Sequence, residues 1–197
     1  MTGAAGRRRL AALAGHQGDI QVARAALLDE DPDVRATALG ALERMGALDA
    51  SALEAALHDE SGIVRGRAAG LASRHTDVSL LGALADGDPA VVEMAAFACG
   101  EHGPAVDQVV VDRLCELAGS HDDVLVREAA VAALGAIGSR SGLPAILSAT
   151  RDKAAVRRRA VIALAPFEGP EVDEALERAR TDRDWQVRQA AEDLQRD

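Results

Sequence analysis

The sequence contains very few aromatic residues: two Phe, one Trp and no Tyr, or 2 % of 197 residues. A conventional globular core of this size relies heavily on large rings, so this chain must build its core from smaller aliphatic side chains. Closely stacked helices rich in Ala and Leu can bury enough apolar area in this way. The low aromatic content therefore favours stacked helices over a single globular core.

Cysteines and long apolar runs are also scarce. Only Cys99 and Cys115 are present, which argues against a secreted domain held together by disulfides. No run of about 18 apolar residues could span a membrane, and the first residues lack the pattern of a signal peptide. We therefore expect a cytoplasmic protein with reduced thiols.

Charge of one sign dominates, with a formal net charge of -10. Before residue 138 acidic residues outnumber basic ones, whereas the remainder is balanced. Binding to nucleic acid or to an anionic membrane depends on cationic side chains, so neither is expected as a partner. The acidic runs at residues 29–31 and 59–60 are interpreted as solvated turns between helices.

One pattern recurs along the whole chain: a valine, usually followed by arginine, with an alanine four residues after the valine. The copies start at Val34, Val64, Val91, Val126, Val156 and Val187. By subtraction these valines are 27 to 35 residues apart, which accommodates two short helices and two turns. We expect an all-α fold, a right-handed solenoid of about six two-helix repeats. We predict a single domain over residues 1–197, with an N-terminal capping helix at 1–17 and repeats near 18–46, 47–76, 77–103, 104–138, 139–168 and 169–197.

The ends of each repeat's second helix are marked by capping residues. Five of the six residues that stand three positions before the valines can cap a helix N-terminus, and Lys153 is the exception, beside Asp152. The five are Asp31, Ser61, Asp88, Asp123 and Asp184. Pro32 and Pro89 suit the first helical position. Helix ends are predicted at Gly46, Gly103, Gly138 and Gly169.

Helical periodicity separates a core face from an opposite face. The valine and the positions four, seven, eight and eleven residues later share one face, which we predict to be the core. In the fourth repeat these are Val126, Ala130, Ala133, Leu134 and Ile137. Positions two, six and nine residues after the valine point to the inner surface of the stack, where glycines such as Gly40 suit solvent. These positions are the candidate binding surface.

The segment D-P-D-V-R-A-T-A-L-G-A-L-E-R-M-G at residues 31–46, with its five further copies, resembles the short HEAT-like repeats of the phycobilisome lyase type. The resemblance spans nearly the whole chain and implies a solenoid whose arginines lie between repeats and bond to neighbouring Asp or carbonyl groups. These structural arginines are Arg35, Arg65, Arg127, Arg157 and Arg188. Val92 replaces the arginine in the third repeat, so the series is interrupted there.

Three enzyme classes are built on this architecture, and each would leave a trace in the sequence. Deoxyhypusine hydroxylase-like enzymes bind iron through His-Glu pairs, but the one adjacent pair here is reversed, Glu101-His102. Alkylpurine glycosylases need a basic groove with aromatics, which an acidic chain with three aromatics does not supply. A bilin lyase is compatible with the fold, but no residue pattern identifies a chromophore site. We expect no enzymatic activity and no cofactor.

A metal site is a weaker alternative. His75 and His102 both stand eleven residues after their valines, and Cys99 shares the helical face of His102. Such a cluster could bind zinc or copper, but no fourth ligand is evident, so a structural role is favoured.

A partner-binding stripe is predicted six residues after the valines of repeats three to five, at Phe97, Ala132 and Ile162. Glu93, Glu128 and Arg158, two residues after the same valines, would form a charged rim. We therefore expect a non-catalytic scaffold that binds a protein or peptide on its inner helical surface. The alternatives are an accessory enzyme of the bilin lyase type or a protein that binds a small molecule or metal.

Overall fold

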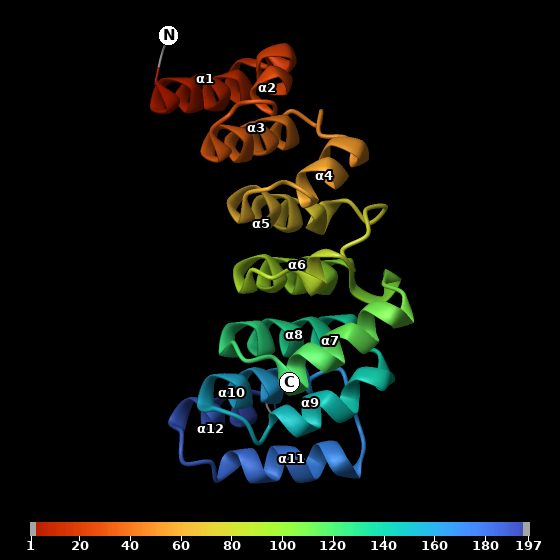
Figure 1. Ribbon diagram of the computed structural model, residues 1–197. Helices are drawn as coiled ribbons and strands as arrows, with labels where there is room; N and C mark the ends of the chain where they lie inside the picture. Colours follow the sequence, from red (N-terminus) through yellow and green to blue (C-terminus); the bar gives the residue numbers. More distant parts are fainter. Residues whose placement is uncertain (1–2, 195–197) are drawn as a thin grey trace. The chain divides into compact units, whose positions relative to one another are not determined.

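The computed structural model describes residues 3–194, and all regular secondary structure among them is helical (Figure 1). The expected all-α solenoid class is therefore confirmed. The chain divides into two compact units, Met1–Ala95 and Ala96–Asp197. The division falls inside one helix, α6 (Pro89–His102). Each unit is described by itself.

The first unit contains a row of three helices, α1, α3 and α5, in which each contacts the next (Figure 1). Shorter helices pack beside this row, α2 against α3 and α4 against α5. The bounds are α1 (Ala4–Gln17), α2 (Ile20–Ala26), α3 (Pro32–Arg44), α4 (Ala50–Leu57) and α5 (Gly62–Leu71). A 3₁₀ turn, η1 (Ala72–Arg74), follows α5.

The second unit repeats this arrangement. Helices α8, α10 and α12 form one row, and α7 and α11 pack against α8 and α12 respectively (Figure 1). The bounds are α7 (Gln108–Ser120), α8 (Val124–Ile137), α9 (Leu143–Ala149), α10 (Ala154–Ala163), α11 (Pro170–Arg180) and α12 (Trp185–Asp193), with 3₁₀ turns η3 (Gly103–Ala105) and η4 (Arg140–Gly142).

The third repeat departs from the expected two-helix form. Between η1 and α6 the chain forms only a short 3₁₀ turn, η2 (Ala83–Ala85), where other repeats have their first helix. The step from Val64 to Val91 is the shortest in the chain, so fewer residues are available there. Short 3₁₀ pieces of this kind serve as connectors.

Most of the predicted helix caps are confirmed. Asp31, Asp123 and Asp184 accept backbone N–H bonds at the starts of α3, α8 and α12. Asp88 accepts the N–H of Ala90 at 3.0 Å in the same way. Ser61 and Lys153 occupy the N-cap position without a side-chain cap bond. Three of the predicted terminating glycines, Gly46, Gly103 and Gly138, have positive φ just after α3, α6 and α8. The prediction for Gly169 is wrong, because α10 ends at Ala163 and Gly169 is the N-cap of α11.

The core consists of small aliphatic side chains at the predicted positions. In α8 the five core residues are at most 6 % exposed. Helices come very close because Ala and Gly face one another: a Cβ built on Gly135 would lie 2.7 Å from the Cα of Ala163. This close packing explains how the chain forms a core with so few aromatic residues. Among residues 3–194, none of the helices has the length and apolarity required to cross a membrane.

Candidate functional site

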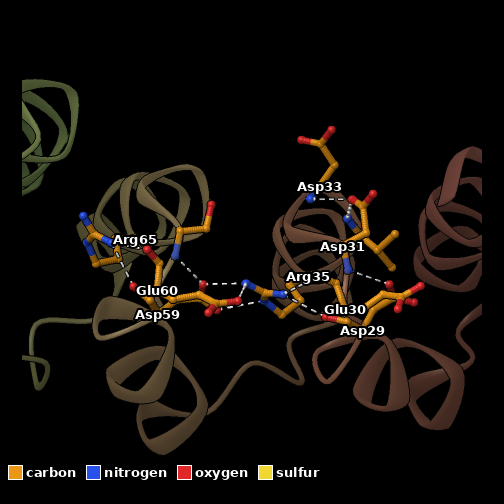
Figure 2. Close-up of polar contacts among 10 residues, drawn as sticks. Asp29, Glu30, Asp31, Asp33, Arg35, Asp59, Glu60 and Arg65 are labelled. Atoms are coloured by element: carbon orange, nitrogen blue, oxygen red, sulfur yellow. Dashed lines mark hydrogen bonds and ion pairs between the residues drawn. The ribbon is translucent and has the colours of Figure 1, made fainter.

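Arginines on the second helices form bidentate pairs with aspartates of the following turn. Figure 2 shows Arg35 of α3, whose Nε and Nη2 donate to the carboxylate of Asp59 at 2.8 and 2.7 Å. Its Nη1 donates to the carbonyl oxygens of Asp29 and Glu30 at 2.8 and 3.2 Å. One guanidinium therefore ties together two successive interhelical turns.

The same geometry recurs in both units, and we call the set the arginine ladder. Its bidentate pairs are Arg7–Asp29, Arg35–Asp59, Arg65–Asp86, Arg127–Asp152 and Arg157–Asp182. Arg188 donates to the carbonyl of Asp182 at 2.7 Å. Sequence reasoning missed Arg7, although the similarity of residues 7–14 to residues 157–165 places Arg7 at the position of Arg157.

The ladder changes the interpretation of the acidic turns. Side chains of Asp29 and Asp59 are only 13 % and 14 % exposed and bind arginines, so these two residues are not the solvated groups that the sequence suggested. The hydrogen bonds from Arg65 and Arg157 lower the pKa values of Asp86 and Asp182, despite partial burial. Each of these two aspartates also accepts a backbone N–H two residues later, at 2.8 Å. The ladder carboxylates are therefore fixed and ionised.

Both members of one ladder pair are replaced in the sequence. Val92 of α6 stands in the arginine position and is buried. His121 stands in the aspartate position, and its Nδ1 accepts the N–H of Asp123 at 3.1 Å. The histidine thus keeps the turn geometry of the aspartate while its arginine partner is absent from the sequence. Each of the five ladder pairs named above lies within one unit.

Apolar side chains are exposed on the second helices of the second unit. Phe97 and Ile162 of the predicted stripe are 49 % and 41 % exposed, and Ala132 is half-buried. Trp185, at the start of α12, is 64 % exposed. Ile162 and Trp185 line the same groove, of about 400 Å³, between α10 and α12. We call it the Ile162–Trp185 groove.

The predicted rim residues are in different situations. Arg158 lines the Ile162–Trp185 groove, and no ion pair is recorded for it with residues 3–194. Glu128 is 19 % exposed and binds Arg159 at 3.4 Å, so its carboxylate is already engaged. Glu93 is half-buried and belongs to the first unit. Thus Arg158 and Ile162 are brought together with Trp185, while Phe97, Ala132 and the two glutamates lie outside this groove.

Sequence reasoning did not select Trp185, which stands two residues before its valine and outside the positions considered. A usable signal was present, because a residue two positions before the core Val187 lies on the opposite side of the helix from the core stripe. Its neighbours in the groove include Gln186, Gln189 and Leu194.

The three residues predicted as a weaker metal-site alternative are in unlike environments, and His102 is half-buried at the end of α6. Nε2 of His75 lies 2.9 Å from Oε2 of Glu43. Cys99 is 1 % exposed, and burial raises its pKa to about 12, which disfavours the thiolate that metals require. Among residues 3–194, no group of three or more His, Cys, Asp or Glu side chains is arranged to hold a metal ion.

The repeat pattern matches a known family. HEAT repeats are detected at residues 78–155 and 111–195, which together span more than half of the chain. The chain belongs to the HEAT-repeat family. No curated protein matches it significantly in sequence.

Solved HEAT-like and armadillo structures share the fold. A designed armadillo repeat protein in complex with the peptide (KR)4 is 18 % identical, with a TM-score of 0.66 over 90 % of this chain and 98 % of that chain. The complex of CpcE and CpcF of phycocyanin lyase from Nostoc sp. PCC7120 is 24 % identical, with a TM-score of 0.63 over 87 % and 74 %. E. coli YibA is 17 % identical, with a TM-score of 0.63 over 97 % and 73 %.

Proposed function

We propose that this HEAT-repeat protein is a non-catalytic scaffold that binds a protein or peptide partner on the face formed by its second helices. The observation that carries the proposal is the Ile162–Trp185 groove, where two large apolar side chains are exposed beside Arg158. Tryptophan and arginine are the residues that most often dominate binding energy at protein interfaces. Because Asp193 also lines the groove, the groove fits a large apolar side chain of a partner with an acidic residue directed toward Arg158.

Two related folds support binding of this kind. The designed armadillo repeat protein holds a peptide, and the phycocyanin lyase structure is a complex of two proteins. Solenoids present continuous surfaces of stacked helices, which suit extended partners. No observation on this chain favours the bilin lyase alternative beyond its fold, and a chromophore retained by the purified protein would show directly as visible absorbance.

The distribution of shifted pKa values supports a non-catalytic role. Among residues 3–194, the titratable groups with shifted pKa values are the ladder's arginines and aspartates and the two cysteines. The ladder residues already bind one another. Burial raises the pKa values of both thiols, which makes them less reactive. Structural ion-pair networks also shift pKa values, and the arginine ladder is such a network. We propose a cytoplasmic location for the same scaffold.

Selection from a random peptide library tests the proposal. The full chain should enrich peptides with a large apolar residue beside an acidic one, and Ile162→Ser with Trp185→Ala should weaken their binding at least about tenfold. The matched control is Ile63→Ser with Leu125→Ala, which also removes two exposed apolar side chains, 57 % and 56 % exposed, away from the groove.

Circular dichroism should show both double variants folded. Equal binding of the selected peptides by the groove variant and the control would contradict the proposed site. Phe97→Ala, measured in parallel, tests whether the predicted stripe extends beyond the groove to α6. Failure of the wild-type chain to enrich any peptide would contradict the scaffold function itself.

A further inference from the structure

The first unit carries a second concavity, whose chemistry differs from that of the Ile162–Trp185 groove. It has a volume of about 290 Å³ and is lined by α1, α3 and α5. Three of its lining residues are arginines, Arg8, Arg44 and Arg67, and its only acidic lining residue is Asp33. The lining thus has a formal charge of +2 in a chain whose net charge is -10. We call it the arginine concavity.

Two glycines make room for these guanidinium groups. A Cβ on Gly40 of α3 would lie 2.4 Å from Nη2 of Arg67, which comes from α5. A Cβ on Gly15 of α1 would lie 2.6 Å from Nη1 of Arg44, which comes from α3. Each guanidinium therefore rests against the preceding helix where a side chain would displace it. Gly40 is buried, so the expectation that this glycine faces solvent is wrong.

The arginines of the concavity are paired quite differently from the ladder arginines of the same helices. Arg35 of α3 and Arg65 of α5 have bidentate aspartate partners. By contrast, no ion pair or side-chain hydrogen bond to residues 3–194 is recorded for Arg44 and Arg67. Arg8 has only a loose contact with Asp33, 3.7 Å between Nη1 and Oδ2. Unpaired guanidinium groups that share one concavity repel each other, and an incoming oxyanion would remove that repulsion.

The three arginines come from three successive helices of one row. Packed helices lie about 8–10 Å apart, and three residues of an extended chain span about 10 Å. An extended peptide that crosses the row could therefore place a carboxylate on every third residue near arginines that successive helices contribute.

We propose that the arginine concavity binds an extended acidic peptide whose carboxylates pair with Arg8, Arg44 and Arg67. The peptide is recognised by charge and spacing, without the apolar anchor that the Ile162–Trp185 groove requires. This site is independent of the groove, because its residues lie on α1, α3 and α5 and those of the groove on α10 and α12. An experiment can therefore contradict peptide binding at one of the two sites and leave the proposal for the other site unaffected.

Fluorescence anisotropy with a labelled peptide of repeated Glu-Ser-Ser triplets tests the proposal on the full chain. Arg44→Gln with Arg67→Gln should weaken binding about tenfold, because two charge-assisted contacts are lost. The matched control is Arg151→Gln with Arg183→Gln, which removes two exposed arginines of the second unit and the same amount of charge. A Lys-Ser-Ser peptide should not bind, and added salt should weaken the Glu-Ser-Ser complex.

Three outcomes would overturn the proposal. The first is no measurable binding of the Glu-Ser-Ser peptide by the wild-type chain. The second is equal binding by the two double variants, which would show that only net charge matters. The third is displacement of the peptide by inorganic phosphate at equal concentration, which would identify a site for a small free anion. Selective loss in the Arg44→Gln, Arg67→Gln variant, with an unchanged melting temperature, is the expected result.

Discussion

The ladder pair Arg157–Asp182 should contribute far more stability than an exposed pair of similar length. Its side chains are only 8 % and 15 % exposed, and the arginine makes two bonds to the carboxylate and one to the carbonyl of Asp152. Arg157→Ala leaves the carboxylate and this carbonyl without their donor, a loss of about 3 kcal/mol. For a chain of this size that lowers the melting temperature by about 6 to 12 °C.

A double-mutant cycle separates the pair from its surroundings. Arg157→Ala, Asp182→Ala and the double variant should give a coupling energy of about 2 kcal/mol from urea unfolding followed by circular dichroism. The control is Arg178–Glu174 of α11, which has the same 2.7 Å ion-pair distance but side chains 40 % and 74 % exposed. Its coupling should be about 0.3–0.5 kcal/mol. A coupling for Arg157–Asp182 no larger than that of the control would refute the structural role of the ladder.

Three further predictions follow from the same contacts. Arginine hydrogen bonds lower the pKa values of Asp86, Asp152 and Asp182, so their stabilisation is complete above the unfolded-state pKa of about 3.9 and is lost as pH falls through the lower folded-state values. The unfolding free energy should therefore drop steeply below about pH 4. An unfolding free energy that does not depend on pH in this range would contradict this account. Gly40→Ala should keep or raise the melting temperature, since alanine favours the helix over glycine by up to about 1 kcal/mol. The same variant should bind the Glu-Ser-Ser peptide more weakly, because the new Cβ displaces the Arg67 guanidinium. Ala130→Asp should lower the unfolding free energy by more than about 3 kcal/mol, because Ala130 is 0 % exposed. Ala132→Asp on the same helix should be tolerated. Similar melting temperatures for the two variants would mean that the core register is wrong.

The sequence contained enough information for the helices and the core, because those features depend on neighbouring residues. Caps such as Asp31, terminating glycines such as Gly138 and the aliphatic stripe of α8 follow from local chemistry and helical periodicity. Ser61 shows the limit, since its side chain has the right chemistry and the N-cap position but makes no cap bond.

Features that depend on contacts between repeats were harder to predict. The resemblance to HEAT-like repeats implied arginines that bond between repeats, but Asp59 was interpreted as solvated because its partner Arg35 lies 24 residues away in sequence. The space over Gly40 is filled by Arg67 of the next repeat, which local periodicity cannot reveal. Trp185 lay outside the positions considered for binding, although it lines the same groove as the predicted Ile162.

The emission of Trp185 tests the central claim most directly, because this is the only tryptophan in the chain and it lines the proposed groove. A labelled peptide selected by the wild-type chain would be titrated while its anisotropy and the tryptophan emission are recorded together. A partner seated in the groove should shift the emission to shorter wavelength and protect Trp185 from acrylamide quenching, with the same saturation as the anisotropy. Saturable binding without any change in Trp185 emission or quenching would contradict the claim that the partner occupies this groove.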